Sequence, residues 1–313
     1  MPTPTIRYWK KKAVLFKLET VYGTDPLPTG AADWLEARNV TLTPYEADTQ
    51  DRSIVQPYMG NGSKLIVSTR QKLSFDLALA GSGALGTAPK IGKVMRACGF
   101  AETITAGTKV EYTLISDSFE SATFYINIDG VLHKGIGARG TCSFKLDGKS
   151  IPLLHVELTS LYFAPIDDAP PVVDRSGWPT EKPVNSKNTL ICKLNAVDSW
   201  YSKFETNVAN QVSHDDLPGG YEVIKIGDRQ PTASITMLAP TLAVFDPFSL
   251  ATAATNFPLQ VVHGTADGEK VQVDLNARIV GVANEDIDGS VGYALTLSPD
   301  PVAGNDEIKL TFL

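Results

Sequence analysis

The sequence is poor in the residues that build metal and redox sites. Only three cysteines and four histidines occur among its 313 residues. Cys98, Cys142 and Cys192 lie far apart, with no C-x-x-C pair and no histidine at zinc spacing. We therefore predict buried, reduced thiols and no zinc site.

Catalytic motifs are lacking as well. The histidines are isolated, and neither an H-E-x-x-H nor a G-x-S-x-G motif accompanies them. A calcium loop needs regularly spaced acids around a glycine, and residues 284–290, NEDIDGS, supply only a fragment of that pattern. The sequence thus predicts no enzyme and no cofactor, and calcium stays a weak alternative.

Long hydrophobic runs are also missing. No window approaches the ~18 uninterrupted apolar residues of a membrane span. The first twenty residues carry charges but no apolar segment that ends in a small-residue cleavage site. We therefore expect no membrane span and no export signal, and we expect the chain to fold in the cytoplasm.

Positive charge is scarce in the second half. Residues 1–169 carry 18 Lys and Arg against 17 Asp and Glu, whereas residues 170–313 carry 10 against 18. An acidic half does not favour a surface that grips nucleic acid, because tight binding needs cations to replace the counterions of phosphates. The only basic cluster, Arg7, Lys10, Lys11 and Lys12, is interpreted as a solvated N-terminal arm.

What the chain has in abundance is period-two alternation broken by Asp-Gly, Gly-Gly and proline, which predicts antiparallel β structure. Leu73, Phe75, Leu77 and Leu79 are one example. Residues 164–183 contain five prolines and cannot form a helix or a central strand. We predict a first domain over residues 1–165, a Pro-rich linker over 166–183 and a second domain over 184–313.

Helical patterns occur once in each half. Over residues 89–98, apolar side chains recur at helical spacing, and Gly99 supplies a stop. Over residues 248–254 an Ala-rich segment follows Asp246 as N-cap and Pro247 at the first position. The predicted fold class is mainly β with minor α, in two tandem sandwich or barrel-like domains that are each flanked by one helix.

The two halves resemble a diverged internal repeat. Residues 70–81 parallel residues 229–240, and residues 124–146 parallel residues 259–280. The offset shrinks between these pairs, so the first half is expected to carry an extra segment over about residues 101–121.

One glycine run imitates a nucleotide site. Gly81, Gly83 and Gly86 form a G-x-G-x-x-G pattern between a strand and a helix. The helix begins too late to direct its N–H groups at a phosphate, and the strand alternates, unlike a central parallel strand. We interpret these glycines as permitting turns and close backbone approach, and a dinucleotide-dependent enzyme stays an alternative.

Three segments carry a resemblance to a known family: residues 17–44, residues 77–100 and, most specifically, residues 129–163, DGVLHKGIGARGTCSFKLDGKSIPLLHVELTSLYF. The last holds an Asp-Gly hairpin, a Gly-Ala-Arg-Gly connection, an alternating strand and an Ile-Pro turn into a closing strand. Together these segments resemble the major tail tube protein of long-tailed, siphovirus-type bacteriophages.

The resemblance implies a β-sandwich or barrel-like domain that assembles into stacked rings, forming the hollow virion tail through which the genome leaves. It implies a long loop, residues 44–64, that reaches the neighbouring ring. Its interaction residues would include Tyr45, Asp48, Asp51, Arg52, Ile54, Tyr58 and Met59.

Two tube domains per chain would make a ring from three chains with pseudo-sixfold symmetry. Six chains are the alternative if the second half is a decoration. The implied partners are other copies, a tape measure protein and tail terminator or distal tail proteins, with assembly in the host bacterial cytoplasm and no membrane. Double-stranded DNA would pass without specific binding along a lumen expected to be acidic.

The main alternative is a β-sandwich module that binds carbohydrate or a receptor. It predicts clustered exposed aromatics, whereas Trp9, Trp34, Trp178 and Trp200 are scattered in the sequence.

Overall fold

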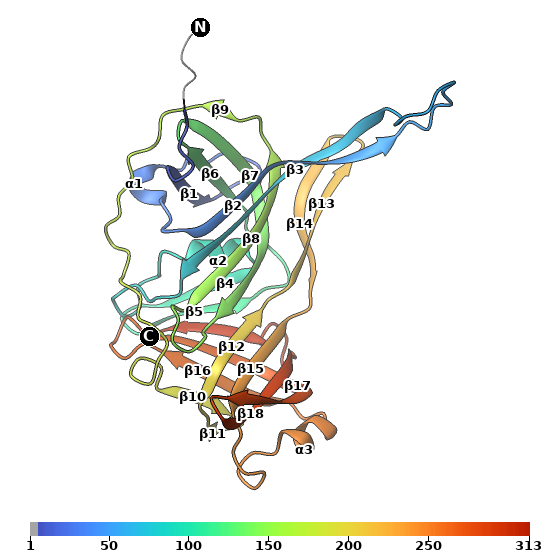
Figure 1. Cartoon of the computed structure of the whole chain (residues 1–313). Helices are drawn as coiled ribbons and strands as arrows, with labels where there is room; N and C mark the ends of the chain where they lie inside the picture. The colour runs from blue at the N-terminus through green and yellow to red at the C-terminus, as the bar shows by residue number, and fades with distance from the viewer. Residues whose placement is uncertain (1–5) are drawn as a thin grey trace.

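The computed structural model describes residues 6–313 (Figure 1), and this part of the chain is mainly β. In the first half the strands are β1 (Lys12–Leu18), β2 (Arg38–Asp51), β3 (Lys64–Ala78), β4 (Phe100–Thr105), β5 (Lys109–Leu114), β6 (Ala122–Ile128), β7 (Val131–Lys145), β8 (Leu153–Tyr162) and β9 (Ile166–Asp167). In the second half they are β10 (Ile191–Leu194), β11 (Val197–Asp198), β12 (Tyr201–Asn207), β13 (Asn210–Leu217), β14 (Tyr221–Arg229), β15 (Thr232–Leu238), β16 (Phe257–His263), β17 (Val271–Ile287), β18 (Ser290–Pro299) and β19 (Ile308–Phe312).

Alternation decides which side of each strand is buried. Leu73, Phe75, Leu77 and Leu79 are all at most 1% exposed and lie in one continuous apolar core. Each such side chain contributes about 1.5–3 kcal/mol when it leaves water. The core continues into the second half. The strands of both halves confirm the predicted fold class, mainly β with minor α.

Three short helices accompany the strands: α1 (Gly30–Asp33), α2 (Gly92–Ala97) and α3 (Pro247–Thr252). The helix predicted over residues 89–98 is confirmed as α2, and Gly99 follows it with φ +86°. The predicted cap of α3 is confirmed too, because the Asp246 side chain accepts hydrogen bonds from the N–H groups of Phe248 and Ser249. The sequence did not predict α1.

The order of strand pairing is the same in the two halves. The first half pairs as β1-β6-β7-β8-β3-β2. The second half pairs as β10-β16-β17-β18-β15-β12. The β4–β5 hairpin lies in the extra segment that the comparison of the two halves predicted over about residues 101–121.

Hydrogen-bonded ladders join the halves at two places. β12 pairs with the end of β7, with Thr206 opposite Phe144. β19 pairs with β5, with Leu310 opposite Tyr112. The two joins turn the strands of both halves into one sheet of 17 strands.

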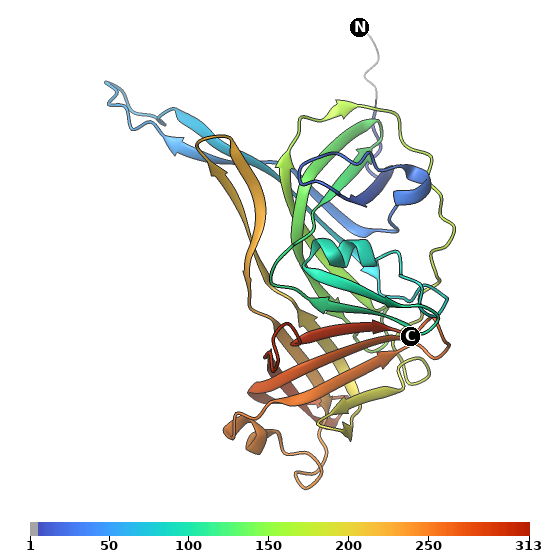
Figure 2. The same ribbon diagram turned by 180° about the vertical axis from the view of Figure 1, so that it is seen from behind.

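Between the halves, the Pro-rich segment runs along the outside of the fold (Figure 2). Its first residues form β9, which pairs at the start of β7, and the rest is extended. Trp178 meets Trp34 edge to face at 6.1 Å between ring centroids. Proline explains the lack of further strand, since it cannot donate to a ladder.

The glycine run after β3 packs against other backbone. The N–H of Gly83 donates to the Gly268 carbonyl in the turn between β16 and β17, at 2.9 Å. A Cβ on Gly86, whose φ is +65°, would collide with the Gly107 nitrogen and lie 2.7 Å from the Thr105 carbonyl oxygen. Close approach between turns thus accounts for these glycines.

Gly86→Ala tests this account of the run. The variant must adopt a left-handed backbone, at about 1–2 kcal/mol, and overpack the Gly107 turn, at about 1–3 kcal/mol. We expect the free energy of unfolding to fall by about 2–5 kcal/mol in denaturant titration. Gly83→Ala is the control, because Gly83 also has positive φ but open space around its Cβ position. An equal loss in both variants would contradict the packing explanation.

Candidate assembly surfaces

One hairpin leaves the body of the molecule and extends into solvent (Figures 1 and 2). It is the outer part of β2 and β3 with the loop that joins them, residues 46–70, here called the first arm. Sequence reasoning expected a loop over residues 44–64, but β2 continues to Asp51 and β3 begins at Lys64. That expectation was wrong for residues 44–51 and for Lys64, which form strands, and the loop is confined to residues 52–63.

Cross-strand ion pairs hold the base of the first arm in strand form. The Arg70 guanidinium lies 2.7 Å from Glu46 and 2.6 Å from Asp48, and Lys72 lies 2.9 Å from Glu46. Hydrogen bonds from Lys72 and Arg70 lower the pKa of Glu46, and a hydrogen bond from Arg70 lowers that of Asp48. Opposite charges on paired strands favour this register.

The tip of the first arm is apolar and exposed. Val55 is 96% exposed and Met59 is 100% exposed. Large exposed apolar side chains on a projecting element favour burial against a partner. The other exposed apolar residues of this arm are Ile54, Tyr58, Leu65, Ile66 and Val67, and Tyr45 lies exposed just before its base.

The other residues of the predicted loop make contacts within the chain. Tyr45 meets Tyr162 edge to face at 5.1 Å. Asp51 accepts a hydrogen bond from the Ser53 N–H at 3.2 Å. The Arg52 guanidinium reaches the Ser63 hydroxyl at 3.5 Å. Their proposed contacts to a neighbouring ring stay a prediction.

A second hairpin, β13–β14, was not predicted from the sequence, and we call it the second arm. It runs alongside the first half and contacts β7 and β8 (Figure 1). Its turn, Pro218-Gly219-Gly220, and the alternating Ile224 and Ile226 were available as signals. Both isoleucines are buried, so the second arm is docked on its own chain.

Two side chains of the first half clasp the second arm at one residue. The Tyr22 hydroxyl accepts from the Ile224 N–H at 2.7 Å, and Arg139 Nη1 donates to the Ile224 carbonyl at 2.8 Å. The Arg139 guanidinium lies 5.0 Å from the Tyr22 ring centroid. Burial lowers the pKa of Arg139 and raises that of Tyr22.

A broad polar face covers eight consecutive strands, ordered β2-β3-β8-β7-β12-β15-β18-β17. We call it the open face. It is rich in short hydroxyl side chains, as alternation with the buried positions dictates. Its ionisable residues are Lys72, Asp76, Lys145, His155, Glu157, Lys203, Glu205 and Glu285.

Each lysine of the open face has a carboxylate beside it. Lys72 lies 2.9 Å from Glu46, Lys145 lies 3.3 Å from Asp147, and Lys203 lies 3.1 Å from Glu285. Glu46 and Asp147 add to the other carboxylates of the face, Asp76, Glu157, Glu205 and Glu285, so each lysine is neutralised locally.

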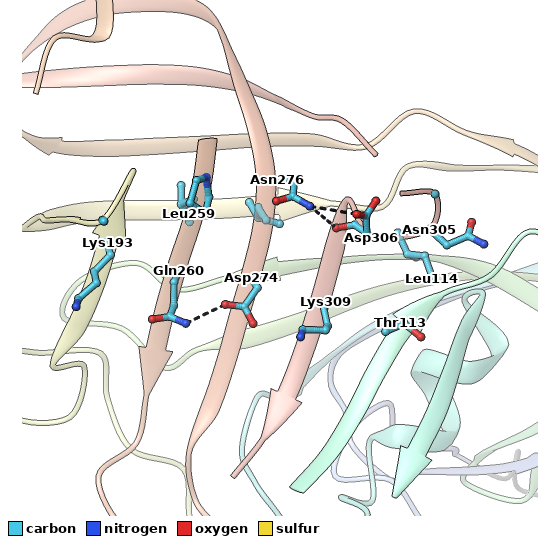
Figure 3. A pocket seen from close by; sticks show the side chains of 14 residues that line it. Thr113, Leu114, Lys193, Leu259, Gln260, Asp274, Asn276, Asn305, Asp306 and Lys309 are labelled. Atoms are coloured by element: carbon cyan, nitrogen blue, oxygen red, sulfur yellow. Dashed lines mark hydrogen bonds between the residues drawn. The ribbon is translucent and has the colours of Figure 1, made fainter. Parts of the chain in front are cut away.

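A groove of about 720 Å³ runs across β10, β16, β17, β19 and β5 (Figure 3). Its polar side chains bond mainly to one another: Gln260 donates to Asp274 at 3.1 Å, and Asn276 donates to the Asp306 carbonyl at 3.1 Å. Such mutual pairing leaves no activated nucleophile in the groove. Within residues 6–313, no group of three His, Cys, Asp or Glu is placed to hold a metal ion.

The basic cluster near the N-terminus contacts its own chain. Arg7 lies 2.8 Å from Asp167, and Lys11 lies 3.3 Å from Asp129. The Lys12 ammonium sits 3.2 Å from the Trp9 ring centroid. Lys10 is exposed beside them. The interpretation of the cluster as a solvated arm stays a prediction.

The molecule thus combines an apolar β core, one hairpin that projects into solvent, a second hairpin docked on the first half and a broad polar face. The family model described as phage tail tube protein matches residues 9–312, and the chain belongs to that family. A search of curated proteins found no match. None of the helices in residues 6–313 is long and apolar enough to cross a membrane.

Proposed function

We propose that copies of this chain assemble into rings that stack as the hollow tube of a phage tail, and that the tube conducts the genome without catalysis. The observation that carries the proposal is the open, eight-stranded face, which ends at β2 on one side and at residues 281–287 of β17 on the other. Both segments have no pairing partner on their outer side among residues 6–313. Exposed edges invite pairing with other chains, and closure of the sheet into a barrel removes them.

Each half would supply one tube unit, so three chains would form a ring with pseudo-sixfold symmetry. The repeated pairing order and the shared projecting hairpins support this division into two domains, with the Pro-rich segment as the linker. The ladder between β12 and β7 supports it further, because it already joins two such units edge to edge.

The open face would line the lumen. An acidic wall was expected from the sequence, and this expectation stays a prediction. The lysines of the open face are already paired with carboxylates and are poorly placed to replace the counterions of DNA phosphates. Local neutralisation, together with many Ser and Thr hydroxyls, would let DNA slide without specific binding.

Freeing the lysines should make the chain hold DNA. The triple variant Glu46→Gln, Asp147→Asn, Glu285→Gln leaves Lys72, Lys145 and Lys203 unpaired. Three new phosphate contacts should make affinity for a short duplex about 40-fold weaker at 200 mM than at 50 mM salt, measured by fluorescence anisotropy. Asp167→Asn, Asp198→Asn, Asp267→Asn is the charge-matched control away from the open face. Equal DNA binding by the two variants would contradict this account of the lumen.

The remaining partners follow from the same role. A tape measure protein would occupy the lumen during assembly, and tail terminator and distal tail proteins would cap the two ends. Assembly would take place in the host bacterial cytoplasm, and the product would reside in the virion tail. Negative-stain microscopy of the concentrated, purified chain tests the proposal through the presence of rings or tubes.

A further inference from the structure

The β7–β12 ladder between the two halves has a defined alternation of hydrogen-bonded and non-hydrogen-bonded residue pairs. The Leu146 N–H donates to the Phe204 carbonyl at 2.8 Å, and the Val208 N–H donates to the Cys142 carbonyl at 3.0 Å. Thr206 and Phe144, which lie midway, therefore form a hydrogen-bonded pair. Asn207 and Ser143 form the adjacent non-hydrogen-bonded pair.

Two strand edges occupy the corresponding places without a partner among the described residues. The first edge is β2. The Leu79 N–H donates to the Pro152 carbonyl, so Leu73, at the same phase of β3, directs its backbone groups toward β8. Leu42, opposite Leu73, therefore turns its own backbone groups away from β3.

The second edge is β17. The Ala239 N–H donates to the Val291 carbonyl, so Tyr293 directs its backbone groups toward β15. Asn284, opposite Tyr293, therefore turns its backbone N–H and C=O away from β18.

These free edges match the two sides of the existing join. Leu42 holds the place in the first half that Thr206 holds in the second. Asn284 holds the place in the second half that Phe144 holds in the first. The chain therefore has one complete join, between β7 and β12. It also carries the two unpaired sides of a second such join, one on β2 and the other on β17.

The arms match as well. A single offset in residue number relates Thr43 to Asn207, Glu46 to Asn210 and Gln50 to His214. Gln50 faces Leu65 in the first arm as His214 faces Ile224 in the second. Ile224 and Ile226 are buried against the first half, whereas Leu65 and Val67 are more than half exposed.

The second half has a surface on β17 and β18 that is similar to the surface of the first half on which the second arm docks. Arg278 lies opposite Ser298 as Arg139 lies opposite Thr159. Arg278 Nε donates to Asn256 at 3.1 Å and Nη2 lies 3.1 Å from Asp300. Its Nη1 has no partner in residues 6–313, and in Arg139 this atom clasps the arm. Val280 beside it is exposed, although no tyrosine replaces Tyr22.

We propose that another copy of this chain places β2 and its first arm on β17 and β18, in the way β12 and the second arm lie on the first half. Leu42 of one copy pairs with Asn284 of its neighbour, Thr43 lies opposite Ala283, and the Leu65 carbonyl accepts from Arg278. This inference rests on the proposed ring assembly and specifies the residues and register of its seam.

Disulfide trapping tests the register. Thr43 and Ala283 are exposed and form a non-hydrogen-bonded pair in the proposed seam, where Cα atoms approach to about 4.5 Å, within disulfide reach. The native cysteines are buried, and burial raises the pKa of Cys192 to about 12, so mild oxidation spares them. Assembled Thr43→Cys, Ala283→Cys protein should give a ladder of covalent oligomers on non-reducing gels, ending at the ring size.

The control variants distinguish the proposed register of the seam from assembly in general. Each single variant should stay monomeric on the gel, and an equal mixture of the two should stop at dimers. Thr43→Cys, Ile287→Cys, four residues out of register, should not cross-link. Rings or tubes without cross-links, or cross-links only in the shifted pair, would overturn the seam and leave the proposed function standing.

Hydrogen exchange gives a second reading that needs no substitution. The amides of Leu42 and Asn284 should exchange quickly in dilute monomer and become protected on assembly. Assembly without that protection would also overturn the seam, and a chain that never assembles would overturn both proposals.

Discussion

Asn284→Pro is expected to abolish tube formation while leaving the monomer folded. Proline removes the N–H that Asn284 turns away from β18, so no bond within the chain is lost. At the proposed seam, the Leu42 carbonyl of the neighbouring copy would be left unsatisfied, at about 1–3 kcal/mol. Each seam should weaken about 5- to 150-fold, and closure of a ring requires every seam. Sedimentation velocity would follow assembly, and circular dichroism would follow the fold.

Asn284→Ala is the matched control, because it removes the side chain and keeps the N–H. It should assemble like the unaltered chain. Ala283→Pro, one residue earlier, removes an N–H directed at β18 and should instead lower the stability of the monomer. Tubes from Asn284→Pro at the ordinary concentration would exclude this edge from the seam.

Removing the apolar tip of the first arm should leave rings that fail to stack. Val55→Ser, Met59→Ser replaces two almost fully exposed side chains, so the monomer has little to lose. If the tip is buried against the next ring, each side chain contributes about 1.5–3 kcal/mol there. Their combined loss should raise the concentration needed for stacking at least about 100-fold. Electron microscopy would show single or short stacked rings.

Val172→Ser, Val302→Ser serves as the control, since both valines are exposed and lie outside the first arm. It should give tubes of ordinary length. Long tubes from the tip variant would show that the tip does not hold rings together.

Local sequence patterns predicted the parts of the fold that local physics decides. Alternation identified the buried face of β3, and the Asp246 cap located the start of α3. The first arm was mistaken for a loop because its strands are stabilised by charge pairs between Glu46, Asp48 and Arg70, which leave no apolar alternation. A helix as short as α1 offers too few residues for a periodic signal.

The join between the halves was beyond the reach of such patterns. β12 meets β7 over only three residue pairs, between segments that are distant in the chain. Nothing local distinguishes Thr206 or Phe144 from other strand residues. The open face was missed for a related reason, because net charge by half says nothing of which side chains share a surface. Its lysines and carboxylates come together only through the pairing of eight strands.

Electron microscopy of the concentrated, purified chain tests the central claim most directly. The account predicts hollow tubes or stacked rings in which three chains close each ring and the open face lines the lumen. A monodisperse monomer at every concentration would contradict it.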